Sequence, residues 1–202
     1  MTHAADLYDA VLMDYAVGAL PRGASVVVAA HLAIRPRAAR WLHALEAAGA
    51  EAFEDEAIAP MEADAAHVMA RAAFAQIPTA LPEPELPDLG AALVDPAGGP
   101  WRTVLPGMRE RAIPGLDATF IQLKAGRTVP RHGHEGLELT LVLHGMFEDD
   151  HGAYHRGDLV VADENVEHRP RVPKGIDCIC LSASLGRPRP SGLIGRLWSA
   201  FN

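Results

Sequence analysis

The chain has 202 residues, of which 49% are hydrophobic and 22% are charged, and its formal net charge at pH 7 is −8. Such a composition is typical of a soluble globular protein, and the length allows one large domain or two small ones. No apolar run is long enough to cross a bilayer, and the first residues lack the basic and apolar regions of a signal peptide, so we predict a cytoplasmic protein that does not bind a membrane.

The negative charge is concentrated in the first half of the chain. Residues 1–100 contain 14 acidic and 5 basic residues, a balance of −9, whereas residues 101–202 contain 12 and 13, a balance of +1. An acidic half argues against direct binding of nucleic acid, because attraction to phosphates supplies much of that affinity. It suits a basic protein partner, although a solvated acidic surface has the same composition.

The first 80 residues are rich in alanine, and their apolar residues recur at helical spacing. We predict an all-α helical bundle over residues 1–80, after which residues 81–100, with five prolines and a Gly-Gly pair, form a linker. The predicted helices cover 6–18, 25–34 with Ser25 as the N-cap, a segment with Pro36 in its first turn that runs through Trp41, and 62–76.

After the linker, short β-branched and apolar segments alternate with glycine and proline turns. Their regular spacing predicts an all-β sandwich or barrel over residues 101–190. The last residues, 191–202, have the apolar spacing of an amphipathic helix, which we expect to dock on the barrel or on a partner subunit. The predicted strands lie within 119–126, 137–145, 157–163 and 176–184.

Three side chains that commonly bind metals, His132, His134 and Glu138, stand directly before and at the start of one of these strands. Residues two apart in a strand share a face, so the two histidines project the same way, and a turn at 135–136 returns Glu138 toward them. His168 ends another predicted strand, and a barrel brings such separated residues to one point. The four side chains predict a site for one divalent ion, with zinc as the first choice and iron, manganese or nickel as alternatives.

The spacing of these residues resembles the first motif of the cupins, G-x5-H-x-H-x3,4-E-x6-G. Gly126, His132, His134, Glu138 and Gly145 match it at every position. The resemblance implies a cupin domain, which is a double-stranded β-helix barrel with the metal site inside.

The second cupin motif, G-x5-P-x-G-x2-H, is matched at its two ends by Gly157 and His168. Asp163 stands at its proline position and Asn165 at its glycine position. Asparagine tolerates the left-handed backbone conformation better than most residues, so we expect the turn to survive.

Other polar side chains near the motifs are interpreted more simply. We expect ordinary polar roles for His144, His151 and His155, and we expect the acidic residues 148–150 to form a turn rather than a catalytic cluster. No catalytic residue is identified in the sequence.

The order of helical domain, linker, cupin and Cys-x-Cys resembles the ChrR-type anti-sigma factors. This resemblance implies a helical domain that binds an extracytoplasmic-function sigma factor and a cupin that acts as a sensor. The zinc signature of that family, H-x3-C-x2-C, here has His31 followed by Arg35 and Ala38. Neither replacement ligates zinc, so we predict a metal-free helical domain, and whether sigma binding survives stays open.

The two cysteines of the chain, Cys178 and Cys180, lie on one face of a predicted strand. The family resemblance favours a role as redox-sensitive thiols, whereas buried free cysteines are often inert packing residues. Both interpretations stay open.

Together these features predict a transcriptional regulator of the ChrR type whose metal-bound cupin is the sensory domain. One alternative is a cupin metalloenzyme, for example an oxygenase, in which an open coordination position admits the substrate. Another is a cupin that binds a small molecule without turnover. A homodimer is compatible with all three.

Overall fold

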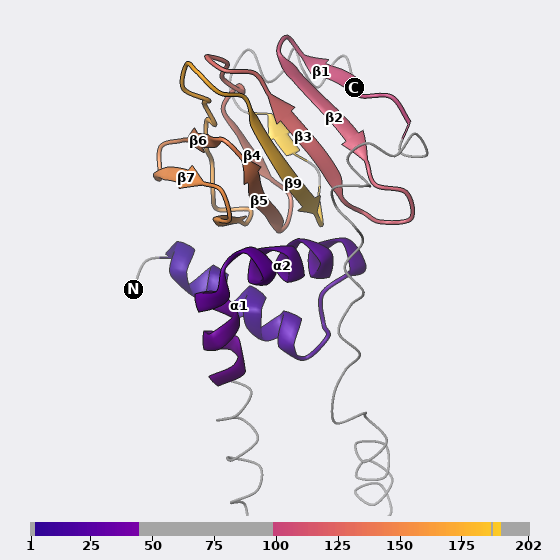
Figure 1. Ribbon diagram of the computed structural model, residues 1–202, viewed down its shortest axis with the longest axis vertical. Coiled ribbons are helices and arrows are strands. Elements are labelled where there is room, and N and C mark those ends of the chain that lie inside the picture. The colour runs from indigo at the N-terminus through magenta and orange to yellow at the C-terminus, as the bar shows by residue number, and fades with distance from the viewer. Residues whose placement is uncertain (1–2, 45–98, 187, 191–202) are drawn as a thin grey trace, which may run out of the picture.

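A computed structural model describes residues 3–44, 99–186 and 188–190, in which helices lie together on one side of the β-structure (Figure 1). The predicted helix over 62–76, the predicted tail helix over 191–202 and nearly all of the predicted linker fall outside these residues. The helical bundle and the predicted domain bounds therefore stay predictions.

The described helices begin close to where the sequence predicts. Helix α1 spans His3–Ala16, α2 spans Arg22–Ile34, and a further helix covers 36–44 with Pro36 as its first residue, as predicted. Every helix among the described residues is too short or too polar to span a bilayer.

The prediction of Ser25 as the N-cap of α2 is wrong. The helix begins three residues earlier, after Pro21, whose φ of −58° suits the residue at a helix start. The Ser25 amide already donates to the Pro21 carbonyl at 2.9 Å, and the Ser25 hydroxyl donates to the Leu20 carbonyl at 3.2 Å.

Six antiparallel strands form the large sheet, in the order β1-β2-β3-β9-β5-β8. All four predicted strands are confirmed, as β3, β5, β8 and β9. The bounds are β1 Arg102–Leu105, β2 Met108–Ala112, β3 Thr119–Leu123, β5 Glu138–His144, β8 Leu159–Ala162 and β9 Cys178–Ser184.

Two strand pairs and a connecting segment form a second layer. Strand β4 (His132–His134) pairs with β10 (Pro188–Pro190), and β6 (Met146–Glu148) pairs with β7 (Ala153–His155). Single bridges join the segment 168–171 to His132 on one side and to Glu148 on the other, so the layer is continuous.

The large sheet has a different neighbour on each face, because successive side chains of a strand point to opposite sides. On one face, Leu139, Leu141 and Leu181 are fully buried in one cluster with Val27 and Val28 of α2. Each such leucine contributes about 1.5–3 kcal/mol through burial. On the other face, the sheet packs against the second layer. Met108, Leu123 and Val142 of the sheet form one buried cluster with Val129, Phe147 and Val172.

Candidate metal centre

Backbone pairing brings three histidines together between the two layers. His132 and His168 lie opposite each other and exchange both backbone hydrogen bonds, at 3.0 and 2.9 Å, so their side chains leave the layer on the same side. His134, two residues along β4, projects to that side as well. All three histidines are buried, as the sequence predicts.

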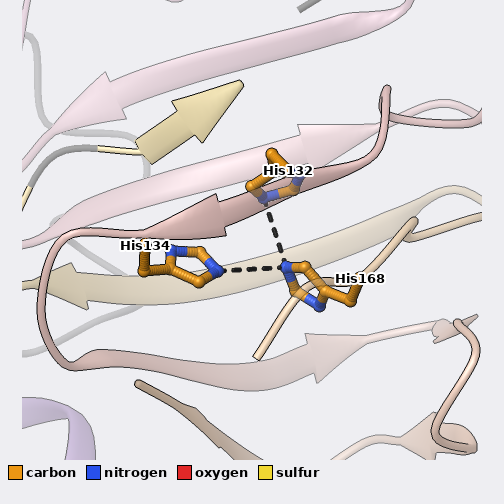
Figure 2. A group of neighbouring side chains, drawn as sticks. All are labelled: His132, His134 and His168. Atoms are coloured by element: carbon orange, nitrogen blue, oxygen red, sulfur yellow. Dashed lines mark hydrogen bonds between the residues drawn. The ribbon is translucent and has the colours of Figure 1, made fainter. Parts of the chain in front are cut away.

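The three imidazoles point toward one another (Figure 2). The Nε2 atom of His168 lies 3.2 Å from Nε2 of His132 and 3.3 Å from Nε2 of His134. Each residue offers one ligand atom to a group whose atoms all lie within 4.8 Å of one another. Ligands about 2.1 Å from a zinc ion in tetrahedral or octahedral directions are about 3.0–3.4 Å apart, which fits this spacing.

The outer nitrogens of two of these rings fix their tautomers. Nδ1 of His132 lies 2.9 Å from the Pro130 carbonyl, and Nδ1 of His168 lies 3.0 Å from Asp149 Oδ2. A carbonyl or carboxylate oxygen only accepts, so each Nδ1 carries the proton and each Nε2 presents a lone pair. Two lone pairs 3.2 Å apart repel unless a cation lies between them, and a metal ion therefore fits this group of residues.

Burial also favours neutral imidazole at this site. The pKa of His132 is lowered by burial first and by the neighbouring His168 second, against the effect of its bond to the Pro130 carbonyl. A neutral ring is the form that binds a metal ion.

Asp149 contacts the histidine group, which the sequence did not reveal. Residues 148–150 do lie at the β6–β7 turn, where Asp149 Oδ1 accepts the amides of His151 and Gly152, as the predicted turn requires. The side chain of Asp149 is nevertheless 1% exposed and holds His168. Burial raises the pKa of Asp149, but the hydrogen bonds from His168 and the two amides lower it by more, so the pKa lies below its usual value. The pairing of Glu148 with Arg171 brings this aspartate next to the segment that carries His168.

Glu138 lies beside the three histidines rather than among them. Its Oε2 atom is 2.8 Å from Nδ1 of His134, but the ring N–H is not aligned with that oxygen, so the buried nitrogen has no hydrogen-bond partner. Burial raises the pKa of Glu138, whereas His134, His168 and the hydroxyl of Thr140 lower it, and the result is about 2. An ionised carboxylate next to an unsatisfied imidazole nitrogen suits a cation site.

A cavity of about 500 Å³ adjoins the histidines between the two layers, and His132, Glu138 and His168 form part of its wall. Cys178 and Cys180 lie on the same wall, with their sulfur atoms 3.6 Å apart. Their hydrogen bond and burial raise the pKa of Cys180 well above its usual value. The predicted shared face of the two cysteines is confirmed.

Glycines fix the ends of the strands that carry the site. Gly145 has a φ of +70°, and a Cβ atom there would lie 2.3 Å from the Asp177 carbonyl oxygen, so only glycine fits.

The turn over 163–166 is formed as predicted, but not through left-handed Asn165, because no described non-glycine residue has a positive φ. Instead, Asp163 Oδ1 accepts the Asn165 amide at 2.9 Å.

The remaining histidines of the β-structure lie outside the centre. His144 is exposed after an irregularity in β5, His155 is exposed, and His151 bonds the Glu167 carbonyl at 3.0 Å.

His31 of α2 is buried, with Nδ1 2.8 Å from the Gly157 carbonyl and Nε2 2.7 Å from the Tyr8 hydroxyl. Arg35 forms an ion pair with Asp158 at 2.6 Å.

Comparisons with known proteins agree on one family. The ChrR cupin-like domain family matches residues 90–185. The anti-sigma-E factor ChrR of Cereibacter sphaeroides is 36% identical over 205 residues, which cover 96% of this chain and 95% of that protein.

Similarity in structure extends over most of the chain. The crystal structure of Rhodobacter sphaeroides SigE in complex with the anti-sigma ChrR contains a chain 35% identical to this one, with a TM-score of 0.63. The match covers 87% of this chain and 96% of that chain. The cupin motifs and the buried histidines agree with this extent of identity, which shows that the chain belongs to the ChrR family of anti-sigma factors.

Proposed function

We propose that this protein is a cytoplasmic anti-sigma factor that binds an extracytoplasmic-function sigma factor through its helical part. The observation that carries the proposal is the identity of 36% to an anti-sigma factor over almost the whole length of both chains. The relative of known structure is in complex with SigE. The same identity makes the metalloenzyme reading the weaker one.

The charge of helix α1 supports a basic protein partner. Helix α1 contains Asp6, Asp9 and Asp14 and no lysine or arginine. Met13, near the end of α1, and Val17, in the turn directly after it, are exposed, with exposed fractions of 50% and 66%. The Val17 amide donates to the Met13 carbonyl, so the two residues lie on the same side. Acidic groups around apolar side chains suit a sigma factor, whose DNA-binding surface is basic.

We also propose that one divalent ion, zinc first, is bound by His132, His134 and His168, with Glu138 as the fourth ligand. Three neutral nitrogens and one carboxylate would also accept iron, manganese or nickel. The ion would join β4, β5 and the segment before residue 169, and so stabilise the sensory part of the protein.

Co-purification tests the sigma partner. The full chain is co-expressed with each extracytoplasmic-function sigma factor of the same organism, and we expect one of them to co-purify and to be inhibited in transcription assays. The variant Met13→Asp with Val17→Asp should lose this binding. A matched control, Ile176→Asp, changes an apolar residue that is 63% exposed on the β-structure, and it should bind normally. Failure of every sigma factor to bind contradicts the proposal.

Elemental analysis tests the metal. We expect about one divalent ion per chain, and loss of that ion from the double variant His132→Ala with His134→Ala. If the folded double variant retains all of its metal, the assignment of His132 and His134 as ligands is wrong.

A further inference from the structure

We propose that the cavity beside the histidines binds a neutral, mainly apolar small molecule with one hydrogen-bonding head group. The inference deepens the proposed anti-sigma function by naming the class of ligand that its cupin domain, as the predicted sensor, would bind, and so rests on that function. The cavity of about 500 Å³ falls within the range of about 300–1,000 Å³ that is usual for small-molecule sites.

The wall of the cavity has a polar strip and an apolar remainder. Thr119 and Thr140 both pair with Ser182 across neighbouring strands, and Thr140 Oγ1 lies 3.2 Å from Ser182 Oγ, so three hydroxyl groups form one row. Hydroxyl groups both donate and accept, which suits an alcohol or a carbonyl group. The rest of the wall includes Met108, Ile121, Leu123, Val129, Phe147 and Val172.

Charge around the cavity argues against an anionic ligand. Among the described residues of the wall, none is lysine or arginine, whereas Glu110, Asp117 and Glu138 are acidic. Arg102 lies 3.8 Å from Glu110, but its side chain is 81% exposed and is not part of the wall. A buried anion in such a cavity would have no lysine or arginine of the described wall as a partner.

The proposed divalent ion does not reverse this conclusion. Two carboxylates already contact its imidazoles: Glu138 Oε2 lies 2.8 Å from His134 Nδ1, and Asp149 Oδ2 lies 3.0 Å from His168 Nδ1. Two formal negative charges balance two positive ones, so the centre is close to neutral without a charged ligand.

Two probes of equal length test the charge preference, 1-decanol and decanoate. Each is titrated by calorimetry into the full-length protein with its metal, at neutral pH. We expect decanol to bind at least ten times more tightly than decanoate. Equal affinities, a preference for decanoate, or no decanol binding at about 100 μM would overturn the inference. Because no sigma factor is present, such a result leaves co-purification with a sigma factor as an independent test.

Substitutions in the wall locate the binding. Ile121→Arg places a cation in the cavity and should weaken decanol at least tenfold while strengthening decanoate, whereas Ile176→Arg, at an exposed position, should change neither. Unchanged decanol binding by Ile121→Arg would place the ligand elsewhere and overturn the inference.

A milder pair of variants covers the case in which Ile121→Arg does not fold. Thr119→Val removes one hydroxyl group of the row at nearly constant volume and should weaken decanol about fivefold. Thr103→Val, at an exposed position of β1, should have no effect. Equal decanol affinities of these two variants would contradict the proposed head-group contact.

Discussion

The imidazole of His31 donates from Nδ1 to the backbone carbonyl of Gly157, at 2.8 Å, and accepts the Tyr8 hydroxyl at Nε2. The hydrogen bond between His31 and Gly157 joins the last turn of α2 to the turn that precedes β8. Gly157 permits the approach, since a Cβ atom there would lie 2.8 Å from Ile34 Cγ2. In this chain, the histidine retained from the zinc signature therefore links helix to sheet.

Loss of this link should destabilise the protein. His31→Phe keeps a planar ring but removes both hydrogen bonds and leaves the buried Gly157 carbonyl without its partner. We expect the free energy of unfolding to fall by about 1–3 kcal/mol in chemical denaturation. His144→Phe, at an exposed position, serves as the control and should change it by about 0.5 kcal/mol or less. Equal effects of the two substitutions would show that the bonds of His31 contribute little.

The same histidine should make stability depend on pH. Burial, as the largest cause, lowers the pKa of His31 below its ordinary value of 6.5 in the folded state. The unfolded chain therefore takes up the proton first, and stability should fall as pH drops below about 6.5 and stop falling below the folded-state pKa.

The contribution of His31 is isolated by comparison with His31→Gln. Denaturation curves of the metal-loaded wild type and variant are recorded from pH 8 to pH 5, roughly the range around the ordinary histidine pKa. The wild type should lose more stability than the variant over this range. Parallel pH profiles would contradict the prediction, because other histidines contribute to both proteins alike.

The ion pair between Arg35 and Asp158 should contribute only modestly. Its side chains are 43% and 35% exposed, so solvent screens the attraction. A double-mutant cycle with Arg35→Met and Asp158→Asn should give a coupling energy of about 0.2–1 kcal/mol that decreases with added salt. A coupling that is larger and independent of salt would mean that the pair is effectively buried.

Asp149 should support metal binding without being a ligand. Asp149→Asn keeps the size of the side chain but weakens its hold on His168 Nδ1, and we expect metal affinity to fall about 10- to 100-fold. Asp150→Asn is a matched control, because Asp150 is the exposed neighbour that pairs with Arg131. Competition with a chelator measures both affinities. If the two variants bind metal equally well, Asp149 has only its role in the turn.

Gly145 should tolerate no side chain. Gly145 and Gly115 both have positive φ angles, +70° and +74°, but only Gly145 has a neighbouring backbone atom within reach of a Cβ. Gly115→Ala should therefore cost about 1 kcal/mol from backbone strain alone, and Gly145→Ala clearly more. Thermal unfolding of both variants checks the difference, and equal losses would contradict the predicted clash with Asp177.

The sequence predicted those parts of the fold that local patterns determine. Strands β3, β5, β8 and β9 are apolar runs between turns, and the metal-site histidines follow the fixed spacing of the cupin motifs. The predicted position of His168 at the end of a strand is wrong, because β8 ends at Ala162 and His168 lies beyond it, in a single bridge to His132. Strand β2 was missed because charged Arg109, Glu110 and Arg111 occupy its centre. Strand β10 was missed because Pro188 and Pro190 read as a loop, and proline is compatible only with the edge position it has here.

Contacts between distant segments were beyond the reach of spacing arguments. Asp149 meets His168 because two segments of the second layer pair.

The burial of α2 against the sheet, by contrast, had a signal in the sequence, since Val26–Ala30 is apolar without interruption and an unbroken apolar helix needs neighbours on more than one side.

Successive side chains of strand β5 face the helices and the cavity in turn. Leu139 and Leu141 contact the cluster that includes the helices, while Glu138 and Thr140, between and beside them, line the cavity. In this seven-residue strand, a substitution at position 138 or 140 therefore changes the wall of the cavity and leaves the packing of Leu139 and Leu141 against the helices in place.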